Sequence, residues 1–443
     1  MDSYIGRKKG PNNVLISKNN IQCKFEDDNN TYLLIGGASS EIVSGEILRD
    51  ILMPTLDYFS YNMECLERNI PVKPLSLHTS IGLSPSINEF LLSLEPHIPI
   101  SWKKEKDWVV TLQVEGSSAV HAAVDIIFQK NIQSGNYSKY IAVGESSYHG
   151  PSSTSFGNGG GSHFVNIKQV TYPVPQIKYK RKDESWSNFL DRIEKNLYKF
   201  LEENYNEIKI VLIEPQWGSA GEGQFWPVDL LRKFVNMARQ YGIYVISDEI
   251  MCGLGRHGRG KTFLVDSLNI EVDAILFGKS IATGAFPLSG AILKEGFNYF
   301  QKKEITPLQS HTYSHGANIL ALLSAIQVLN YLPNLIPNVK KIGACIGDLF
   351  DKLKPNRNIY VSGQGCLWGI YINYNNLPFT KEILYKKLHE NRVIVYFIPH
   401  GILITPIYNS KLKLIKEAIT KIIKVLNILI TQGGKVEIEQ SIK

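Results

Sequence analysis

From about Asp107 onward, short apolar segments of strand length alternate with longer segments of helical period. The first strand-like segment, DWVVTLQV, precedes SSAVHAAVDIIFQK, where apolar residues recur at helical spacing between Val120 and Phe128. The alternation continues through KYIAVG, IKIVLIEP, IYVISDE and VDAILFGKS, with amphipathic stretches among them. Strands that are apolar on both faces and separated by helices are typical of a mostly parallel sheet with helices on each side. The sequence therefore predicts an α/β fold, to which LSGAILK adds a further short strand.

The two ends of the chain have a different pattern. Residues 1 to about 75 are expected to be irregular, apart from a hairpin signal at CKFEDDNNTYLLI, where DDNN supplies turn residues. After about Tyr331, the prolines of LPNLIPN are expected to break a helix, and NIYVSGQGCLWGIYINY predicts an antiparallel pair of strands. A last, basic helix carries an apolar face from Leu412 to Leu426. Such a helix can lie on a membrane, but packing against the core of a terminal domain is the commoner use.

Composition narrows the class of protein. The chain has 443 residues, 44% of them hydrophobic and 20% charged, which is typical of a soluble globular protein with room for a second, smaller domain. Its net charge of +7 comes from scattered lysines and does not indicate nucleic-acid binding. The five cysteines form no CxxC pair, which favours reduced thiols in a cytosol. The start has no apolar signal region, and no apolar run is expected to approach the ~18 residues of a membrane span. We therefore expect a cytoplasmic protein without a membrane partner.

Polar side chains gather where the predicted strands end. Because ligands of doubly wound sheets bind at the carboxyl ends of the strands, these groups are the candidates for chemistry. They comprise EGSS (115–118), SYHG (147–150), EPQWG (214–218), SDE (247–249) and FGKS (277–280). Together they supply a turn suited to phosphate, an aromatic ring, acidic groups and an amine.

The segment EGSS lies between a strand and the start of a helix. Free backbone N–H groups and the helix dipole favour an anion there, and the hydroxyls of Ser117 and Ser118 add donors. The alternative is that one of these serines simply caps the helix. The phosphate-binding pattern GxxxxGK[ST] is absent, so the segment is not a nucleotide-binding loop of that kind.

Lys279 and Asp248 are the two residues with the strongest chemical implications. Lys279 ends the apolar run AILFG, so it is either a surface residue that terminates a strand or a Schiff-base lysine made nucleophilic by desolvation. Asp248 ends the preceding strand-like run, with room for one crossover between them. A carboxylate buried at such a position needs a cation opposite it, and a protonated pyridine ring is such a cation.

These residues resemble the class III aminotransferases, a family of pyridoxal-phosphate (PLP) enzymes with the aspartate-aminotransferase-like fold type I. DEIMCGLGRHG resembles the family's D-E-x-x-x-G-[FL]-G-R-x-G signature, and DAILFGKSIATGAFPLSGAI resembles its lysine segment. EGSSAVHAA, SYHG, IEPQWGSAG and HTYSHGANILAL are similar to further motifs, in the family's order. The resemblance covers about residues 85 to 330 and continues weakly to the end of the chain.

The resemblance implies a role for each site residue. Asp248 would pair with the pyridine nitrogen, and Lys279 would form the Schiff base and later move a proton between substrate and cofactor carbons. Tyr148 would stack on the ring. The implied cofactor-binding set also contains Gly116, Ser117, Ser118, His149, Glu214, Met251 and Thr312. Thr312 would reach the phosphate of a partner subunit, so an obligate homodimer with shared active sites is expected. No metal site is predicted.

The resemblance also implies a domain plan and a reaction. A large PLP-binding domain over residues 76–334 would be joined by a small α+β domain built from residues 1–75 and 335–443. The reaction would move an amino group from an amine or amino-acid donor to an oxo acid or aldehyde acceptor. An aminomutase, epimerase or decarboxylase of the same family, or a binding paralogue with altered catalysis, remains an alternative. A nucleotide-binding enzyme is disfavoured because VEGSSAVH is not GxGxxG.

Several family features are absent from this chain. Met251 stands where many members have glutamine, and Ser118 stands where the phosphate turn usually carries glutamate. Many members bind a substrate carboxylate with an arginine that otherwise pairs with a glutamate. The corresponding positions hold Leu403 and Ser219, which predicts a substrate without the usual carboxylate placement. The alternative is that the alignment is displaced and that Arg392 binds the carboxylate from another strand.

Overall fold

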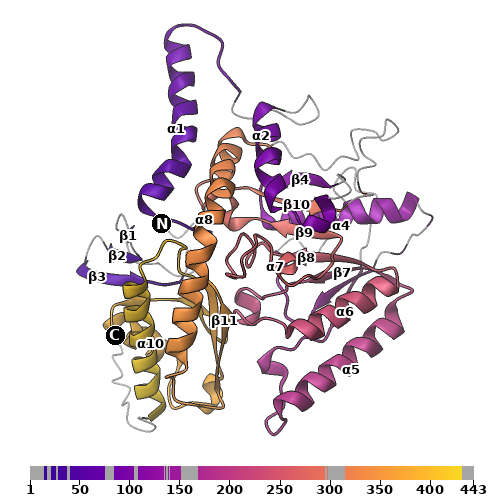
Figure 1. Cartoon of the computed structure of the whole chain (residues 1–443). Helices are drawn as coiled ribbons and strands as arrows, with labels where there is room; N and C mark the ends of the chain where they lie inside the picture. The colour runs from indigo at the N-terminus through magenta and orange to yellow at the C-terminus, as the bar shows by residue number, and fades with distance from the viewer. Residues whose placement is uncertain are drawn as a thin grey trace, which may run out of the picture.

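The computed structural model describes residues 14–16, 21–25, 28–36, 40–74, 84–103, 108–133, 135, 138, 140–150, 168–294, 297 and 315–431. Its centre is a seven-stranded sheet with the order β4-β10-β9-β8-β7-β5-β6 (Figure 1). The strands span Val109–Gln113 (β4), Tyr140–Gly144 (β5), Lys168–Tyr172 (β6), Ile208–Ile213 (β7), Tyr244–Asp248 (β8), Ala274–Phe277 (β9) and Ser289–Leu293 (β10).

The directions of these strands determine where their ends meet. Strands β6, β5, β7, β8 and β9 are parallel to their neighbours in that order, whereas β10 is antiparallel to both β9 and β4. Strand β4 therefore runs in the same direction as β9. The prediction of a mostly parallel sheet is confirmed, and the carboxyl ends of β4, β5, β7, β8 and β9 all lie at one edge.

Helices cover both faces of this sheet, as the doubly apolar strands predict. Helix α4 (Gly116–Gln133) shares one buried cluster with Ile210 and Leu212 of β7. Val211 and Ile213, the alternate residues of the same strand, pack with helices α5 (Trp186–Asn204) and α6 (Val228–Gln240) on the other face. Shorter helical segments are α2 (Pro85–Leu94), α3 (Ile100–Lys103), α7 (Leu264–Ser267) and 3-10 turns at Glu95–His97, Ile177–Tyr179, Ser219–Gly221, Lys279–Ala282 and Tyr374–Asn376.

Segments from both ends of the chain form the remaining part of the fold. One sheet has the order β11-β12-β15-β14 and comes from the C-terminal part, and the other has the order β1-β2-β3-β13. Their bounds are Val14–Ile16 (β1), Gln22–Phe25 (β2), Asp28–Leu34 (β3), Ile359–Gln364 (β11), Leu367–Ile372 (β12), Val393–Ile394 (β13), Tyr396–Ile398 (β14) and Gly401–Ile404 (β15), with helices α9 (Lys381–Glu390) and α10 (Leu412–Thr431). The parallel pairing of β13 with β3 joins the two ends of the chain.

Three sequence predictions in these flanking segments are confirmed. Strands β2 and β3 form the expected hairpin, and β11 and β12 form the expected antiparallel pair. Helix α10 buries its apolar stripe, including Ile415, Ile419 and Ile422, in the core against helix α8 (Ile319–Phe350), as a terminal core helix would. The proposed boundaries near residues 75 and 334 stay predictions, and the second falls inside α8.

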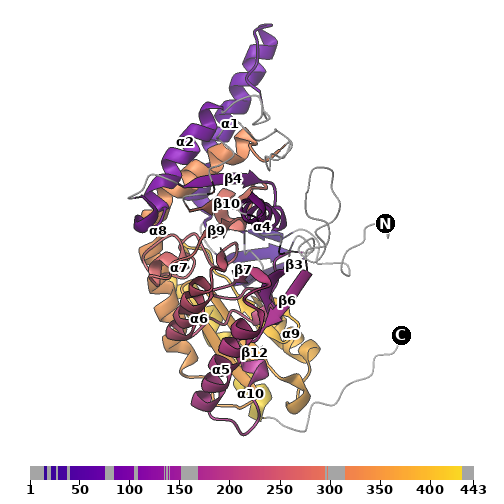
Figure 2. The ribbon, with the colours of Figure 1, turned by 90° about the vertical axis from the view of Figure 1, so that its right-hand side faces the viewer.

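The prediction that the N-terminal segment is irregular was wrong. Helix α1 (Gly45–Glu67) is 23 residues long and extends away from the sheet in both ribbon views (Figures 1 and 2). Two of its buried positions, Thr55 and Asn62, are polar, large apolar residues such as Leu56 and Phe59 are exposed, and Pro54 lies inside it, so its apolar pattern does not mark the buried face. The buried positions of α1 are only Ile51, Thr55, Asn62 and Cys65.

The prediction that LPNLIPN breaks a helix was also wrong. Helix α8 continues through both Pro333 and Pro337. A proline removes the N–H that would bond the carbonyl four residues earlier, which for Pro333 is the carbonyl of Leu329. The ring of His97 makes a hydrogen bond with that carbonyl, and its Nδ1 lies 2.6 Å from Thr262 Oγ1. A side chain from another segment thus replaces the lost helical bond.

Helix α8 corrects one further expectation. Within the described part of the chain, α8 is the one helix whose length and apolar composition would allow it to cross a membrane. An 18-residue window of α8 has a mean hydropathy of 1.7. The expectation that no apolar run approaches that length was therefore wrong. However, 67% of the window is buried inside the protein, and α8 packs against α1, α2 and α10. These contacts are typical of the central helix of a globular core.

Candidate active site

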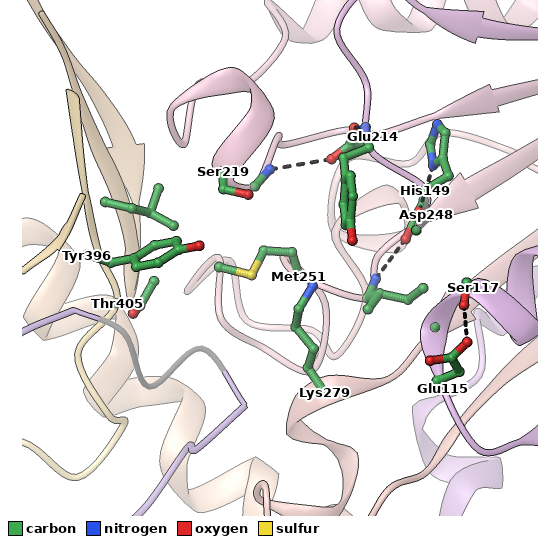
Figure 3. Close-up of a pocket in the computed structure, with 16 residues that line it drawn as sticks. Glu115, Ser117, His149, Glu214, Ser219, Asp248, Met251, Lys279, Tyr396 and Thr405 are labelled. Atoms are coloured by element: carbon green, nitrogen blue, oxygen red, sulfur yellow. Dashed lines mark hydrogen bonds and ion pairs between the residues drawn. The ribbon is translucent and has the colours of Figure 1, made fainter. Parts of the chain in front are cut away.

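A cavity of about 570 Å³ opens at the edge where the five strand ends meet (Figure 3). One side is formed by the loops that follow these strands, and the other by the C-terminal strands β14 and β15. The described residues that line it are Glu115, Gly116, Ser117, Tyr148, His149, Gly150, Glu214, Gly218, Ser219, Asp248, Ile250, Met251, Lys279, Tyr396, Leu403 and Thr405. The fold therefore brings all five polar groups of the sequence into one site.

Lys279 projects into this cavity from the loop after β9 (Figure 3). It begins a 3-10 turn and has a left-handed φ of 40°, a conformation that non-glycine residues rarely adopt and that is enriched at functional sites. Burial lowers the pKa of the Lys279 amine, although the charges of Asp248 and Glu214 oppose the shift. A lowered pKa increases the share of neutral amine, which is the nucleophilic form.

Asp248 ends β8 and is held in the cavity by two hydrogen bonds. Its Oδ2 lies 2.7 Å from His149 Nδ1, and its Oδ1 accepts the backbone N–H of Ile250 at 3.2 Å. Burial alone would lower the pKa of His149, but the contact with Asp248 and the charge of Glu214 raise it overall. The Nε2 atom of His149 is buried and has no hydrogen-bond partner among the described residues. The contact with Asp248 therefore favours a supporting role for His149, in which it positions the carboxylate of Asp248.

The neighbouring acid, Glu249, has a different environment. It is 1% exposed, does not line the cavity, and accepts the backbone N–H groups of Leu264 and Val265 at the start of α7. Burial raises the pKa of its carboxyl group to about 8. Of the two acids in SDE, Asp248 therefore faces the cavity, whereas Glu249 accepts hydrogen bonds from the backbone at the start of α7.

Glu214 connects the loops that follow β5 and β7. Its Oε1 accepts the N–H of Tyr148 at 3.0 Å, and its Oε2 accepts the N–H of Gly218 at 3.4 Å. Burial raises the pKa of its carboxyl group. Tyr148 is 55% exposed and lines the cavity, so its aromatic ring is accessible to a flat ligand there.

Ser117 and Gly116 form the turn at the start of α4. Gly150 has a left-handed φ of 95°, and a Cβ atom there would collide with the side chain of Ser117. A Cβ atom on Gly116 would lie 2.9 Å from Ile250 Cδ1. These glycines allow the loops to pack closely around the turn. Ser118, which was also predicted to bind the cofactor, is not among the described residues that line the cavity.

One part of the cavity, called the neutral wall here, is lined by residues without charge: Ser219, Met251, Tyr396, Leu403 and Thr405. Met251 and Ser219 come from the large sheet's loops, whereas Tyr396, Leu403 and Thr405 come from the C-terminal part of the chain (Figure 3). The structure therefore places Leu403 and Ser219 together in the cavity, as the sequence comparison of their positions implied. Lys279 is the only lysine or arginine among the described lining residues.

Two earlier candidates have a different outcome. Arg392 is exposed in the turn between α9 and β13 and does not line the cavity, so it is not placed to bind a carboxylate there. Thr312 lies outside the described residues.

Some residues of the site were missed in the sequence. Glu115, Gly150, Gly218 and Ile250 lie within or beside the quoted motifs and are signalled by them. Tyr396 had no such signal, because its strand is far from every motif and reaches the cavity only through the tertiary fold.

The donor set suits a PLP ring with its phosphate. A buried amine, a carboxylate for a ring nitrogen, an exposed aromatic face and a helix-start turn line one cavity. Lys279 would hold the cofactor covalently, Asp248 would face the ring nitrogen, and the turn at Gly116 would hold the phosphate. The residues present therefore fit the cofactor.

Curated relatives carry related activities in their names. The chain is 24% identical over 323 residues to adenosylmethionine-8-amino-7-oxononanoate aminotransferase of Staphylococcus aureus, covering 68% of this chain and 71% of that protein. It is 29% identical over 225 residues to ornithine aminotransferase of Plasmodium yoelii yoelii, covering 48% and 52%. An alanine/serine racemase of Pyrococcus horikoshii is 27% identical over 292 residues, covering 61% and 58%. The chain thus spans only about half the length of some of the relatives that it matches.

Solved structures and a family profile complete the comparison. An (S)-enantioselective omega-transaminase from Thermomicrobium roseum has a TM-score of 0.76 at 19% identity, covering 96% of this chain and 94% of that chain. A PMP-bound aminotransferase from Vibrio fluvialis has a TM-score of 0.74 at 18% identity, covering 95% and 94%. These structures share fold type I with this chain. The profile described as Aminotransferase class-III matches residues 87–426. The chain therefore belongs to the class III aminotransferase family of PLP-dependent enzymes.

Proposed function

We propose that the chain is a transaminase that takes an amino group from an amine or amino-acid donor and passes it to an oxo acid or aldehyde. The observation that carries this proposal is the buried amine of Lys279, with its lowered pKa, in the same cavity as the carboxylate of Asp248. When bound, PLP supplies an electron-withdrawing ring that stabilises negative charge on a substrate carbon.

The residues of the site divide the work among them. Lys279 Nζ would hold the cofactor and would serve as the base that accepts and returns a proton at the reacting carbon of the substrate. Asp248 would keep a proton on the ring nitrogen, and the 2.7 Å contact with His149 Nδ1 orients Asp248. The ring of Tyr148 would cover one face of the cofactor and exclude water from it. Glu214 fixes the loop that carries Tyr148 through the backbone N–H of that residue.

A second reaction class uses the same groups. Racemisation would need a proton to be returned to the same carbon on its opposite face, and a relative of this chain is named an alanine/serine racemase. The two reactions differ in their products. A screen of amines and oxo acids with purified protein, following both the cofactor spectrum and the products, separates nitrogen transfer from inversion. Formation of only the mirror-image amino acid, with no new oxo acid, would reject the transaminase proposal.

Substrate choice follows from the neutral wall. We expect glutamate and oxoglutarate to react slowly compared with a terminal amine and a small oxo acid such as pyruvate. A second carboxylate would be desolvated against Met251, Tyr396 and Leu403, and Lys279 is the only lysine or arginine among the described residues that line the cavity. The preference is measured as the rate at which the cofactor's visible absorption bleaches in single-turnover mixing. The rate with the terminal amine should exceed the rate with glutamate about tenfold or more.

A variant can test the same wall. Leu403→Arg is expected to improve the rate with glutamate relative to the terminal amine, whereas Arg392→Ala, outside the cavity, should leave the preference unchanged. Fast conversion of glutamate at low concentration by the natural protein would contradict the proposal for this wall.

We further propose that the chain forms a homodimer with shared active sites. Helix α1 extends from the body, and large hydrophobic residues along it are exposed, among them Met53, Leu56, Phe59, Met63 and Leu66. Exposed apolar surface of this extent is typical of an interface between subunits.

We also propose a cytoplasmic location, without nucleic-acid or membrane partners. The described cysteines are free, which is in keeping with this location.

Complementation between subunits checks the shared site. Thr312→Ala is expected to raise the dissociation constant of PLP several-fold, since the phosphate contact that the resemblance implies for Thr312 would be lost. Mixing inactive Lys279→Ala subunits with Thr312→Ala subunits should give an activity that differs from the average of the two preparations. Sedimentation of the active species as a monomer would contradict the proposal.

A further inference from the structure

Glu115 lies within the turn that the proposed function assigns to the cofactor's phosphate. It directly precedes Gly116, the first residue of α4, and its Oε1 accepts the hydroxyl hydrogen of Ser117 (Figure 3). Both Glu115 and Ser117 line the cavity. A negative charge therefore already lies at the helix start, on the serine hydroxyl that a phosphate would need.

The two acidic groups compete for the same donor. A serine hydroxyl has a single hydrogen, so it cannot donate to Glu115 and to a phosphate oxygen at the same time. A phosphate held by the backbone N–H groups of this turn would also lie close to the carboxylate of Glu115, which repels it. Among the described lining residues, Lys279 is the only lysine or arginine available to offset this repulsion.

The packing fixes the position of Ser117 but leaves its hydroxyl able to rotate. Ser117 is only 5% exposed, and its Cβ lies where a Cβ atom on Gly150 would be, so the two loops hold its backbone and Cβ in place. Glu115 is exposed to solvent and free to rotate. Donation by Ser117 to a phosphate therefore requires its hydrogen bond to Glu115 to break.

We propose that Glu115 weakens the retention of the cofactor phosphate, because its carboxylate competes for the hydroxyl hydrogen of Ser117 and repels the phosphate. This inference rests on the proposed function, which places the phosphate at this turn. Its consequence is a cofactor that exchanges readily with solution. Glu115 is thus a determinant of cofactor affinity and does not act in the chemical step.

Cofactor affinity in charge-removing variants tests the proposal. The full chain, freed of cofactor by dialysis, is titrated with PLP and, separately, with pyridoxal, which lacks the phosphate. Glu115→Gln removes the charge and keeps an acceptor for Ser117, whereas Glu115→Ala also releases the hydroxyl. Both variants should bind PLP about tenfold more tightly or better, with pyridoxal affinity unchanged.

A neighbouring acid supplies the matched control. Glu145 follows β5 at the same edge of the sheet but does not line the cavity, so Glu145→Gln should leave PLP affinity at the natural value. Unchanged or weaker PLP binding in both Glu115 variants, or an equal gain for pyridoxal, would overturn the role of Glu115. Failure of every variant to bind PLP would overturn the proposed function together with this inference.

Discussion

Replacement of Lys279 by alanine is expected to abolish turnover, with a loss on the order of 10⁴-fold or more. Lys279 is the only amine among the described residues that line the cavity, and burial lowers its pKa toward the neutral, nucleophilic form. The variant should still bind PLP, because the turn at Gly116 and the ring of Tyr148 remain. Steady-state assays with the best donor and acceptor measure the loss.

Chemical labelling identifies the attachment point independently of activity. The natural protein should be yellow, and borohydride should fix a pyridoxyl group on the peptide that contains Lys279. Lys294 is a suitable control, since it follows β10, whose antiparallel direction puts its end at the opposite edge of the sheet, and it pairs with Glu271. Lys294→Ala should retain both label and activity. A label on another lysine, or a protein that stays colourless with added PLP, would refute the assignment.

The central part of the site follows directly from the sequence because it depends on local order. Each polar group comes immediately after an apolar run, and parallel strands bring the ends of such runs to one edge. Asp248 and Lys279 are thereby placed in one cavity once β8 and β9 are seen as parallel neighbours. The same reasoning cannot find Tyr396, whose strand reaches the cavity only through the pairing of the C-terminal strands.

Long-range contacts also explain the failed predictions. Pro333 would end an isolated helix, but the hydrogen bond of His97 with the carbonyl of Leu329 and the burial of α8 outweigh the local penalty. Helix α1 buries polar Thr55 and Asn62 and exposes large apolar residues, so its apolar pattern does not indicate which face is buried. The parallel pairing of β13 with β3 likewise joins segments whose separation in the sequence gives no local signal.

Asp248→Asn is expected to retain the fold and the bound cofactor but to lose turnover on the order of 10³-fold. An amide has nearly the shape of a carboxylate, yet it carries no charge to keep a proton on the ring nitrogen. Its oxygen can accept from His149 or from the N–H of Ile250, whereas the carboxylate accepts from both. The variant should therefore also lose roughly 1–3 kcal/mol of stability.

The adjacent acid separates the two effects. Glu249 is buried outside the cavity and accepts the N–H groups of Leu264 and Val265, so Glu249→Gln should change the urea midpoint and leave turnover nearly unchanged. Parallel measurement of kcat and urea midpoint in Asp248→Asn and Glu249→Gln then assigns chemistry to one acid and structure to the other. Near-normal turnover of Asp248→Asn would mean that Asp248 only holds His149 and the loop after β8. A negative charge that can be removed without loss of turnover cannot be stabilising a pyridinium.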